Sequence, residues 1–423
     1  MNVPDQQALI AAAADTQATG SKPDDADIRT KRMAGACMTL AGRAPHKAPG
    51  ECQPGDISYR TDSSPSPWRT TMNFLDGHLF PENQQPLIIT AAPYAPGWLP
   101  ADFPEDIPVT MEDQIQKAVD CYNAGATVLH LHVRELDGRG SKRLSMFNEL
   151  IAGVRKAVPE MIIQVGGSIS FAPENEGQAA KWLADDTRHM LAELEPTPDQ
   201  VTVTVNTSQM NVTDQAEDAD FRGTSRANPA IFDAYKEMTV PAQPGWVEEH
   251  VRRLTAKGIQ SAFQCYNLNS FESVERLMRR GFYKGPLVMN WVAIAGGMDT
   301  PNVYSLANFI RAVPDGAVVT VESNVRNVLP VNMMGIAMGL HVRCGTEDCL
   351  WNQSRTEKMS TVKQIEQLVG ISREFGREIA TAKQAREISR IGVFFDTVEE
   401  SLQENGFAPN RNGGNQGFLR KTF

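Results

Sequence analysis

The sequence predicts an α/β protein folded as a (β/α)8 barrel, and two observations support this. From Pro86 onward, short apolar or β-branched runs recur eight times, and stretches with helical spacing lie between them. Alternation of strands and helices is typical of a parallel sheet, and eight repeats favour a closed barrel. An open, doubly wound sheet is the alternative. The first run, however, is followed by "PYAPGW" and not by a glycine-rich phosphate-binding turn.

The expected strands share a short apolar core bounded by polar or turn residues. They cover 87–92, 127–133, 162–166, 201–206, 262–267, 287–292, 317–322 and 339–344. Between them, "MEDQIQKAVDCYNAG" and "SFESVERLMRRG" have the spacing of amphipathic helices and end at glycine, which favours a helix terminus. The long segment that begins at Thr361 is expected to form the eighth helix and further helices that close the barrel.

The chain divides into two parts of different composition. Residues 1–84 are rich in Pro, Gly, Ser and Asp and show little periodicity, so we expect an irregular N-terminal extension without chemistry of its own. Residues 85–423 form the predicted barrel catalytic domain with its closing helices.

Composition narrows the class of protein. A net charge of −10 argues against nucleic acid or an anionic membrane as the main partner. No apolar run approaches the roughly 20 residues of a membrane helix, and "ALIAAAA" near the N-terminus lacks the basic lead of a secretory signal. The six cysteines form no C-x-x-C pair and are expected to be reduced thiols. We therefore expect a cytoplasmic protein.

The second expected strand carries the first chemical signal, "VLHLHVR". His130 and His132 are two residues apart and therefore point to the same face of a strand. In a (β/α)8 barrel the active site lies at the C-terminal strand ends, where paired imidazoles suit Zn²⁺ or another divalent cation. Glu347 and Asp348, just after the eighth strand, are candidates for the missing carboxylate ligand. The alternatives are hydrogen-bonded strand histidines and an exposed acidic turn.

Four segments, "PLIITAA", "AGATVLHLHVRELDGRGSKR", "IIQVGG" and "HVRCGTED", resemble in this order the β-keto acid cleavage enzyme family. The resemblance runs from about Pro86 to about Ile388. It implies a (β/α)8 barrel acyltransferase that converts a β-keto acid and acetyl-CoA into acetoacetate and a new acyl-CoA, with cleavage of a C–C bond. It also implies a homo-oligomer, with a tetramer as the expected form.

The resemblance assigns roles to individual residues. It implies that Zn²⁺ (or another divalent ion) is bound by three side chains, His130, His132 and Glu347. The metal would hold the keto acid and polarise its carbonyl, which acidifies C2. Asp348 resembles the family's base and Arg343 its charge partner, and a carboxylate beside two cations is expected to stay ionised. Glu322, at the end of the seventh strand, is the alternative base.

The expected substrate contacts follow the same resemblance. Thr204 and Asn206 match the family's T-x-N on the fourth strand, although capping of the strand end is the alternative. The third strand ends in "QVGGSIS", so Gly166 stands where the family's reference member has serine. Ser168 replaces that serine only if the loop is re-formed, and an ordinary loop serine is equally compatible with the sequence.

The expected pocket has less negative charge than that of the family's amine-binding member. Gly97, Gln264 and Asn267 stand where that member has acidic side chains. A buried ammonium group without a carboxylate partner is costly. The sequence therefore predicts a substrate with a neutral or anionic tail.

Two other classes of protein remain as alternatives. One is a different divalent-metal barrel lyase or a hydrolase, although amidohydrolase-type enzymes need H-x-H on the first strand, and "LIITAA" has no histidine. The other is a catalytically inactive barrel that only binds a ligand. The presence of His130, His132, Glu347 and Asp348 argues against an inactive barrel.

Overall fold

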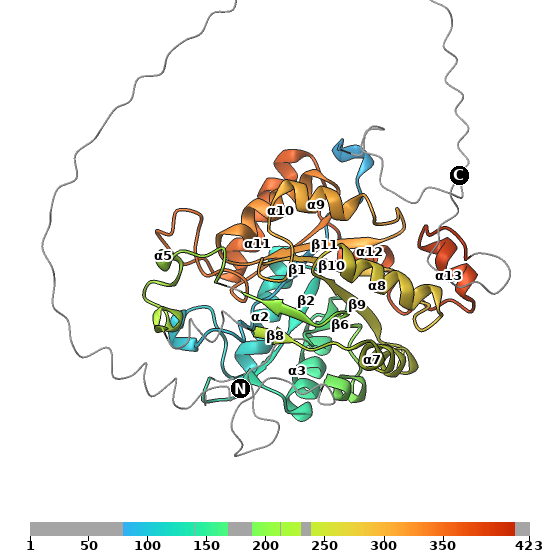
Figure 1. Cartoon of the computed structure of the whole chain (residues 1–423). Coiled ribbons are helices and arrows are strands. Elements are labelled where there is room, and N and C mark those ends of the chain that lie inside the picture. The colour runs from blue at the N-terminus through green and yellow to red at the C-terminus, as the bar shows by residue number, and fades with distance from the viewer. Residues whose placement is uncertain (1–78, 139, 168–187, 212, 230–237, 411–423) are drawn as a thin grey trace, which may run out of the picture.

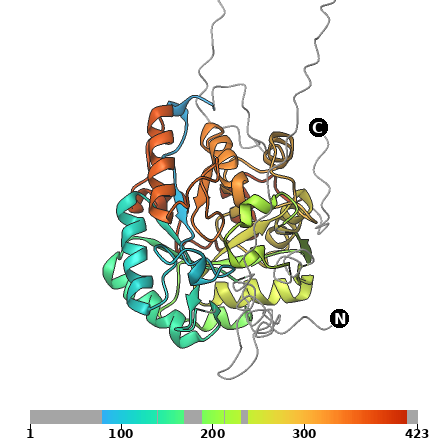
Figure 2. The same ribbon diagram turned by 90° about the vertical axis from the view of Figure 1, so that its left-hand side faces the viewer.

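Eight parallel strands close into a barrel with helices on its outside, which confirms the predicted (β/α)8 fold class (Figure 1). The computed structural model describes residues 79–138, 140–167, 188–211, 213–229 and 238–410. Around the barrel the strands follow the order β1, β2, β5, β6, β9, β10, β11, β12, and β12 pairs with β1. A quarter-turn of the molecule shows helices surrounding the sheet (Figure 2).

Each barrel strand overlaps one of the eight predicted runs. The strands are β1 Ile89–Ala91, β2 Val128–Leu131, β5 Ile162–Val165, β6 Gln200–Thr204, β9 Gln260–Cys265, β10 Val288–Ala293, β11 Val318–Ser323 and β12 His341–Cys344. β6 and β9 begin earlier than predicted, each with a glutamine. A polar residue at the edge of an apolar run is typical of a loop, but here both glutamine side chains are buried inside the barrel.

The helices between the strands have recognisable ends. They are α2 Met111–Ala124, α3 Leu144–Ala157, α7 Pro244–Ala256, α8 Leu268–Arg279, α9 Val303–Ile310, α10 Val328–Ala337 and α11 Thr361–Phe375. In α2, the Thr110 hydroxyl accepts the backbone N–H of Asp113, and Gly125 ends the helix at φ 117°, a conformation that favours glycine. Both glycine-ended helices predicted from the sequence, α2 and α8, are confirmed.

Shorter elements lie in the loops. The 3-10 helices are η3 Pro81–Asn83, η4 Pro100–Asp102, η5 Met190–Glu193, η6 Ser225–Ala227 and η7 Val325–Asn327. Two antiparallel pairs join β3 Val133–Arg134 to β4 Gly140–Ser141 and β7 Ser208–Met210 to β8 Met238–Val240. The short helix α5 Asp218–Phe221 belongs to the insertion between β7 and β8.

The barrel strands bury both of their faces, but the two faces differ in chemistry. Residues that point toward the helices, such as Leu129, Val203 and Met289, belong to one continuous apolar core. The alternate positions point inward and are mostly polar. The buried inward-facing polar residues include Thr90, His130, Gln164, Gln200, Thr202, Gln264, Asn290, Thr320, Glu322 and Arg343. The interior of the barrel, called here the lumen, is therefore polar toward its C-terminal end.

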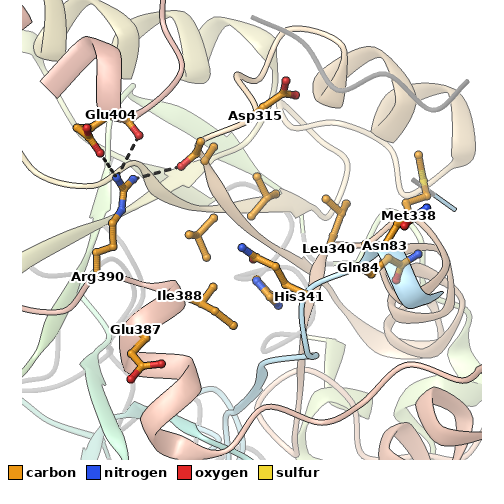
Figure 3. Close-up of a pocket in the computed structure, with 16 residues that line it drawn as sticks. Asn83, Gln84, Asp315, Met338, Leu340, His341, Glu387, Ile388, Arg390 and Glu404 are labelled. Atoms are coloured by element: carbon orange, nitrogen blue, oxygen red, sulfur yellow. Dashed lines mark hydrogen bonds and ion pairs between the residues drawn. The ribbon is translucent and has the colours of Figure 1, made fainter. Parts of the chain in front are cut away.

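The N-terminal end of the barrel is covered by the closing helices. After α11 the chain forms α12 Ala382–Ile388, and α13 Val398–Glu404 follows. Ile388 packs against Ala262, Val288 and Val318. Beside it lies a cavity of ≈ 390 Å³, which His341 and Arg390 also line (Figure 3). This end of the barrel is opposite to the histidines of β2, so the cavity does not belong to the predicted site.

Some predictions fall wholly or partly outside the described residues. Of the predicted N-terminal extension, residues 79–84 are described and include η3. Among the described cysteines, Cys121, Cys265, Cys344 and Cys349 are buried and unpaired. No described helix combines the length and the apolar character needed to cross a membrane.

Candidate active site

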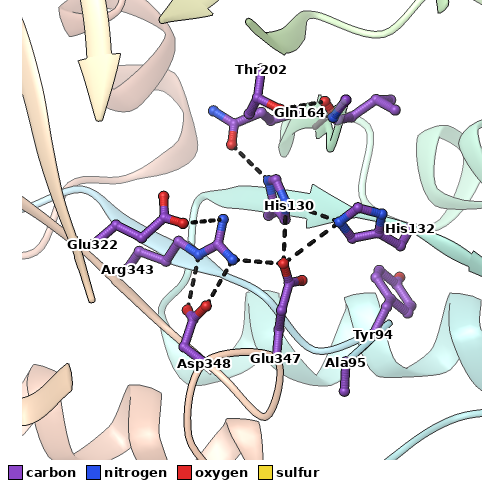
Figure 4. Close-up of polar contacts among 12 residues, drawn as sticks. Tyr94, Ala95, His130, His132, Gln164, Thr202, Glu322, Arg343, Glu347 and Asp348 are labelled. Carbon is purple, nitrogen blue, oxygen red and sulfur yellow. Dashed lines mark hydrogen bonds and ion pairs between the residues drawn. The ribbon is translucent and has the colours of Figure 1, made fainter. Parts of the chain in front are cut away.

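Three potential metal ligands converge at the C-terminal ends of β2 and β12 (Figure 4). The Nε2 atoms of His130 and His132 are 3.2 Å apart, and each lies 3.6 Å from Oε1 of Glu347. His130 belongs to β2, His132 follows it directly, and Glu347 lies three residues after β12. One ligand atom from each residue lies within 4.8 Å of the others. The closed barrel brings these residues together because β12 and β2 both flank β1.

His130 is held as a neutral imidazole. Burial lowers its pKa to about 3, and the charge of Arg343 lowers it in the same direction. Its Nδ1 lies 2.9 Å from Oε1 of Gln164, the paired residue on the neighbouring strand β5. Since an amide oxygen only accepts, this contact calls for a proton on Nδ1. The lone pair of Nε2 is then directed toward Glu347, as a metal ligand requires.

Glu347 presents a carboxylate that is only partly satisfied. Burial raises its pKa, but Arg343 and then the two histidines outweigh burial and hold the pKa below its ordinary value. Oε1 accepts a hydrogen bond from Nη2 of Arg343 at 2.8 Å, whereas Oε2 is buried and has no partner among the described residues. An ionised, under-bonded carboxylate beside two imidazoles is a donor set that suits Zn²⁺.

Gly166 makes room for the two imidazoles. It follows β5, and a Cβ at this position would overlap the ring of His132 and lie 2.8 Å from Nε2 of His130. In the sequence, Gly166 stands where the family's reference member has serine. The structure gives a steric reason for the glycine, since a Cβ on this backbone would require the histidine rings to shift.

A single buried guanidinium faces three carboxyl groups. Arg343 donates to both oxygens of Asp348, at 2.9 Å from Nε and 2.8 Å from Nη2. It also contacts Glu347 and, at 3.4 Å, Oε1 of Glu322. The other oxygen of Glu322 accepts from the side-chain amide of Asn290 at 3.0 Å. The structure places Arg343 in the lumen.

The carboxyl group of Asp348 is buried close to Arg343, Glu347 and Glu322. Burial raises its pKa to about 7, although Arg343 acts in the opposite direction and the carboxylates of Glu347 and Glu322 add to the rise. Burial also raises the pKa of Glu322. Burial wins because one arginine has to compensate three carboxylates. That Asp348 stays ionised beside both Arg343 and a bound divalent cation stays a prediction.

The residues predicted to bind substrate have other contacts in the structure. The hydroxyl of Thr204 is 2.9 Å from that of Tyr266, and Oδ1 of Asn206 accepts from Ser273 at 2.9 Å. Ser168 lies outside the described residues. The substrate-binding role of these three residues stays a prediction.

Gly97, Gln264 and Asn267 stand where the amine-binding family member has acidic side chains. Gln264 faces the lumen and pairs with Asn290 on β10. Asn267 instead caps α8, where its side-chain oxygen accepts the backbone N–H of Ser270. Its amide is therefore explained by the start of the helix. Of Gln264 and Asn267, only Gln264 therefore faces the site.

A loop from the insertion is fixed beside the ligands. The indole N–H of Trp98 donates to the backbone oxygen of Glu347 at 3.3 Å. The guanidinium of Arg226, from η6, stacks on the Trp98 ring at 3.8 Å and donates to the carbonyl of Gly97 at 3.1 Å. Ser225 also donates to the carboxylate of Asp102 at 2.6 Å. A cationic side chain is thus anchored at the backbone of Gly97.

A closed barrel with buried, interacting titratable groups at its C-terminal strand ends defines the class of (β/α)8 barrel enzymes. Within that class the chain belongs to the β-keto acid cleavage enzyme family, whose sequence model matches residues 86–391. The family resemblance noted in the sequence is confirmed.

The curated relatives are distant in sequence, but the matches cover nearly their full length. The chain is 26% identical over 307 residues to 3-keto-5-aminohexanoate cleavage enzyme of Acetoanaerobium sticklandii, covering 71% of this chain and 97% of that protein. It is 25% identical to 3-oxoadipate:acetyl-CoA acetyltransferase of Cupriavidus necator, covering 72% and 94%. It is 22% identical to 3,5-dioxohexanoate:acetyl-CoA acetone transferase of Paraburkholderia graminis, covering 72% and 96%.

The steric role of Gly166 is tested by Gly166→Ala. The added methyl group should push the imidazoles out of place and lower the free energy of unfolding by about 1–3 kcal/mol, measured by urea denaturation. Gly370→Ala is the control, because a Cβ there, on the exposed side of α11, meets no atom within 4 Å. This control should be neutral or slightly stabilising. Equal stability of the two variants would contradict the steric argument.

Proposed function

We propose that the chain is a Zn²⁺-dependent β-keto acid cleavage enzyme that uses acetyl-CoA as co-substrate. The observation that carries the proposal is the convergence of His130, His132 and Glu347 within 4.8 Å beside the Arg343–Asp348 pair. Family membership supports acetyl-CoA as the co-substrate, and so do the names of the Cupriavidus necator and Paraburkholderia graminis relatives, both of which include acetyl-CoA. The products are acetoacetate and the acyl-CoA derived from the keto acid.

The three ligands fit a divalent cation on chemical grounds. They combine two imidazole nitrogens and an ionised carboxylate, and Oε2 of Glu347 lacks a protein partner among the described residues. Zn²⁺ favours such a set of three protein ligands in catalytic sites, with a further position for substrate. When bound, the cation would act as a Lewis acid toward the oxygens of the keto acid.

Asp348 is the proposed base. Its carboxyl group is buried, its pKa of about 7 lies near neutrality, and Arg343 fixes its orientation through two hydrogen bonds. A base with a pKa near the working pH transfers protons efficiently. Asp348 would remove a proton from C2 of the keto acid, and Arg343 would keep the carboxylate in place throughout.

The overall reaction is balanced without a further reactant. A keto acid of form R–CO–CH₂–COO⁻ and acetyl-CoA exchange acyl groups, so that acetoacetate leaves with the CH₂–COO⁻ unit and R–CO becomes the new thioester. The bond between C2 and C3 of the keto acid and the C–S bond of acetyl-CoA break. A C–C bond from C2 to the acetyl carbonyl and a C–S bond from the CoA thiolate to R–CO form. The proton that Asp348 takes from C2 is returned when the products form.

Electrostatics favour a keto acid whose tail is neutral or anionic. Gln264 offers an amide toward the lumen, and Arg226 adds a positive charge at the Gly97 carbonyl. Neither group compensates an ammonium. A neutral or anionic tail avoids this uncompensated charge.

The proposal is tested by incubating the purified full-length protein with acetyl-CoA and a panel of β-keto acids. Acetoacetate should appear together with a new acyl-CoA in equal amounts. Hydrolysis of acetyl-CoA without acetoacetate would support a different metal-dependent barrel enzyme, and no turnover with any keto acid would support the binding-barrel alternative.

The metal site predicts about one Zn²⁺ per chain by elemental analysis. His130→Ala and His132→Ala should lose metal and activity together, because each removes one of three protein ligands. His250→Ala is the control, since this buried histidine lies in α7 and outside the cluster. Full metal content in both ligand variants would refute the assignment.

Asp348→Asn should keep its metal but lose about 10²–10⁴-fold in kcat. The amide keeps the shape of the side chain but cannot accept the C2 proton. Asp396→Asn, at an exposed position, is the control and should behave like the wild type. If Asp348→Asn turns over at the normal rate, Glu322 becomes the next candidate for the base.

A β-keto acid with an amine in its tail should be a poorer substrate than its neutral isostere. The expected difference in kcat/KM is on the order of 100-fold, because an unpaired buried ammonium costs several kcal/mol. The two substrates are compared at equal acetyl-CoA. A preference for the amine would overturn the argument about the tail and leave the metal site and reaction untouched.

A further inference from the structure

Three buried glutamines extend from the candidate metal site across the lumen. Nδ1 of His130 is 2.9 Å from Oε1 of Gln164 (Figure 4). Nε2 of Gln164 donates to Oε1 of Gln200 at 2.9 Å, and Nε2 of Gln200 donates to Oε1 of Gln260 at 2.7 Å. Nε2 of Gln260 then donates to the backbone oxygen of Ser389 at 2.9 Å. We call these four hydrogen bonds the glutamine chain.

The strand register creates this chain. His130, Gln164, Gln200 and Gln260 are direct neighbours on the four consecutive strands β2, β5, β6 and β9. Barrel strands tilt against the barrel axis, so a row of paired residues descends along that axis. The row accordingly begins near the C-terminal end of β2 and ends at the first residue of β9, where α12 covers the barrel.

The far end of the chain determines its direction. A backbone carbonyl only accepts hydrogen bonds, so Gln260 has to turn its NH₂ group toward Ser389. Its oxygen then faces Gln200, which in turn has to present NH₂. The same reasoning passes through Gln164 to His130, whose Nδ1 has to carry the proton. Reversal of any single amide would place two acceptors or two donors against each other.

Water has little access to the chain, so it cannot supply hydrogen bonds to two donors or two acceptors that face each other. The exposed fractions of Gln164, Gln200 and Gln260 are 3%, 2% and 0%. In this buried environment an unpaired amide group is costly, so one orientation of the chain is strongly favoured. Ser389 follows α12 directly, and its carbonyl is one of those that a helix end leaves without a partner inside the helix.

We propose that Gln164, Gln200 and Gln260 are positioning residues that hold His130 in its Nδ1-protonated form, with the carbonyl of Ser389 as the fixed end. The C-terminal segment thereby contributes to a site at the opposite end of the barrel. The effect on metal binding rests on the proposed metal site, whereas the effect on the tautomer of His130 does not.

Two measurements on the full-length protein test this proposal. The first is the ¹⁵N spectrum of the histidine side chains in metal-free protein, in which the His130 signals are identified by their loss in His130→Ala. The second is the Kd for Zn²⁺, from competition with a chelator. The variants are Gln200→Leu and Gln260→Leu, neither of which touches a proposed ligand. Thr320→Val is the control, because Thr320 faces the lumen but takes no part in the chain.

The wild type should show the proton on Nδ1 of His130. Both glutamine variants should show a mixture of tautomers and bind Zn²⁺ about tenfold more weakly, whereas Thr320→Val should match the wild type. A wild-type His130 protonated on Nε2 overturns the proposal even if a variant fails to fold. Variants with an unchanged tautomer and Kd also overturn it. If the wild type does not bind Zn²⁺, the metal proposal fails and the spectrum still decides the tautomer.

Discussion

The site depends on the charge of Arg343, which lies in a lumen that would otherwise be strongly acidic. Its guanidinium contacts Glu322, Glu347 and Asp348. Glu322 and Asp348 are buried with it, and Glu347 is partly buried. One positive charge cannot balance three negative ones in a medium of low dielectric constant. The pKa values reflect this competition, since Glu347 stays ionised while burial raises those of Asp348 and Glu322. A divalent cation would bring the cluster close to neutrality.

The polar lumen requires a hydrogen-bond partner for each buried polar group that faces it. In each barrel strand the outward residues join the apolar core, and the stability of the barrel can rest on that side. The inward residues are then available for chemistry, but buried polar groups need hydrogen-bond partners. The glutamine chain meets this need for four strands, and the Arg343 cluster meets it for β11 and β12. Gly166 keeps the space between the two imidazoles and β5 open.

Loops that are far apart in sequence hold the mouth of the barrel together. Trp98, from the loop after β1, contacts the backbone of Glu347, and Arg226 from the insertion stacks on the same indole. Arg326, from η7, forms a 2.8 Å ion pair with Asp220 of α5. The insertion is thereby tied to the loops after β1 and β11. Changes in this insertion therefore reach the surroundings of Glu347 without altering the barrel.

The sequence by itself determined the barrel, its eight strands and the two histidines, because short apolar runs and helix ends are local signals. It also singled out Glu347, Asp348 and Arg343, because all three belong to one short segment, "HVRCGTED", that resembles a motif of the family. Only the tertiary structure decided which groups meet. Closure between β12 and β1, the register of Gln164 with Gln200 and Gln260, and the burial that raises the pKa of Asp348 all involve residues distant in sequence. Such contacts and the local dielectric constant exist only once the chain has closed on itself.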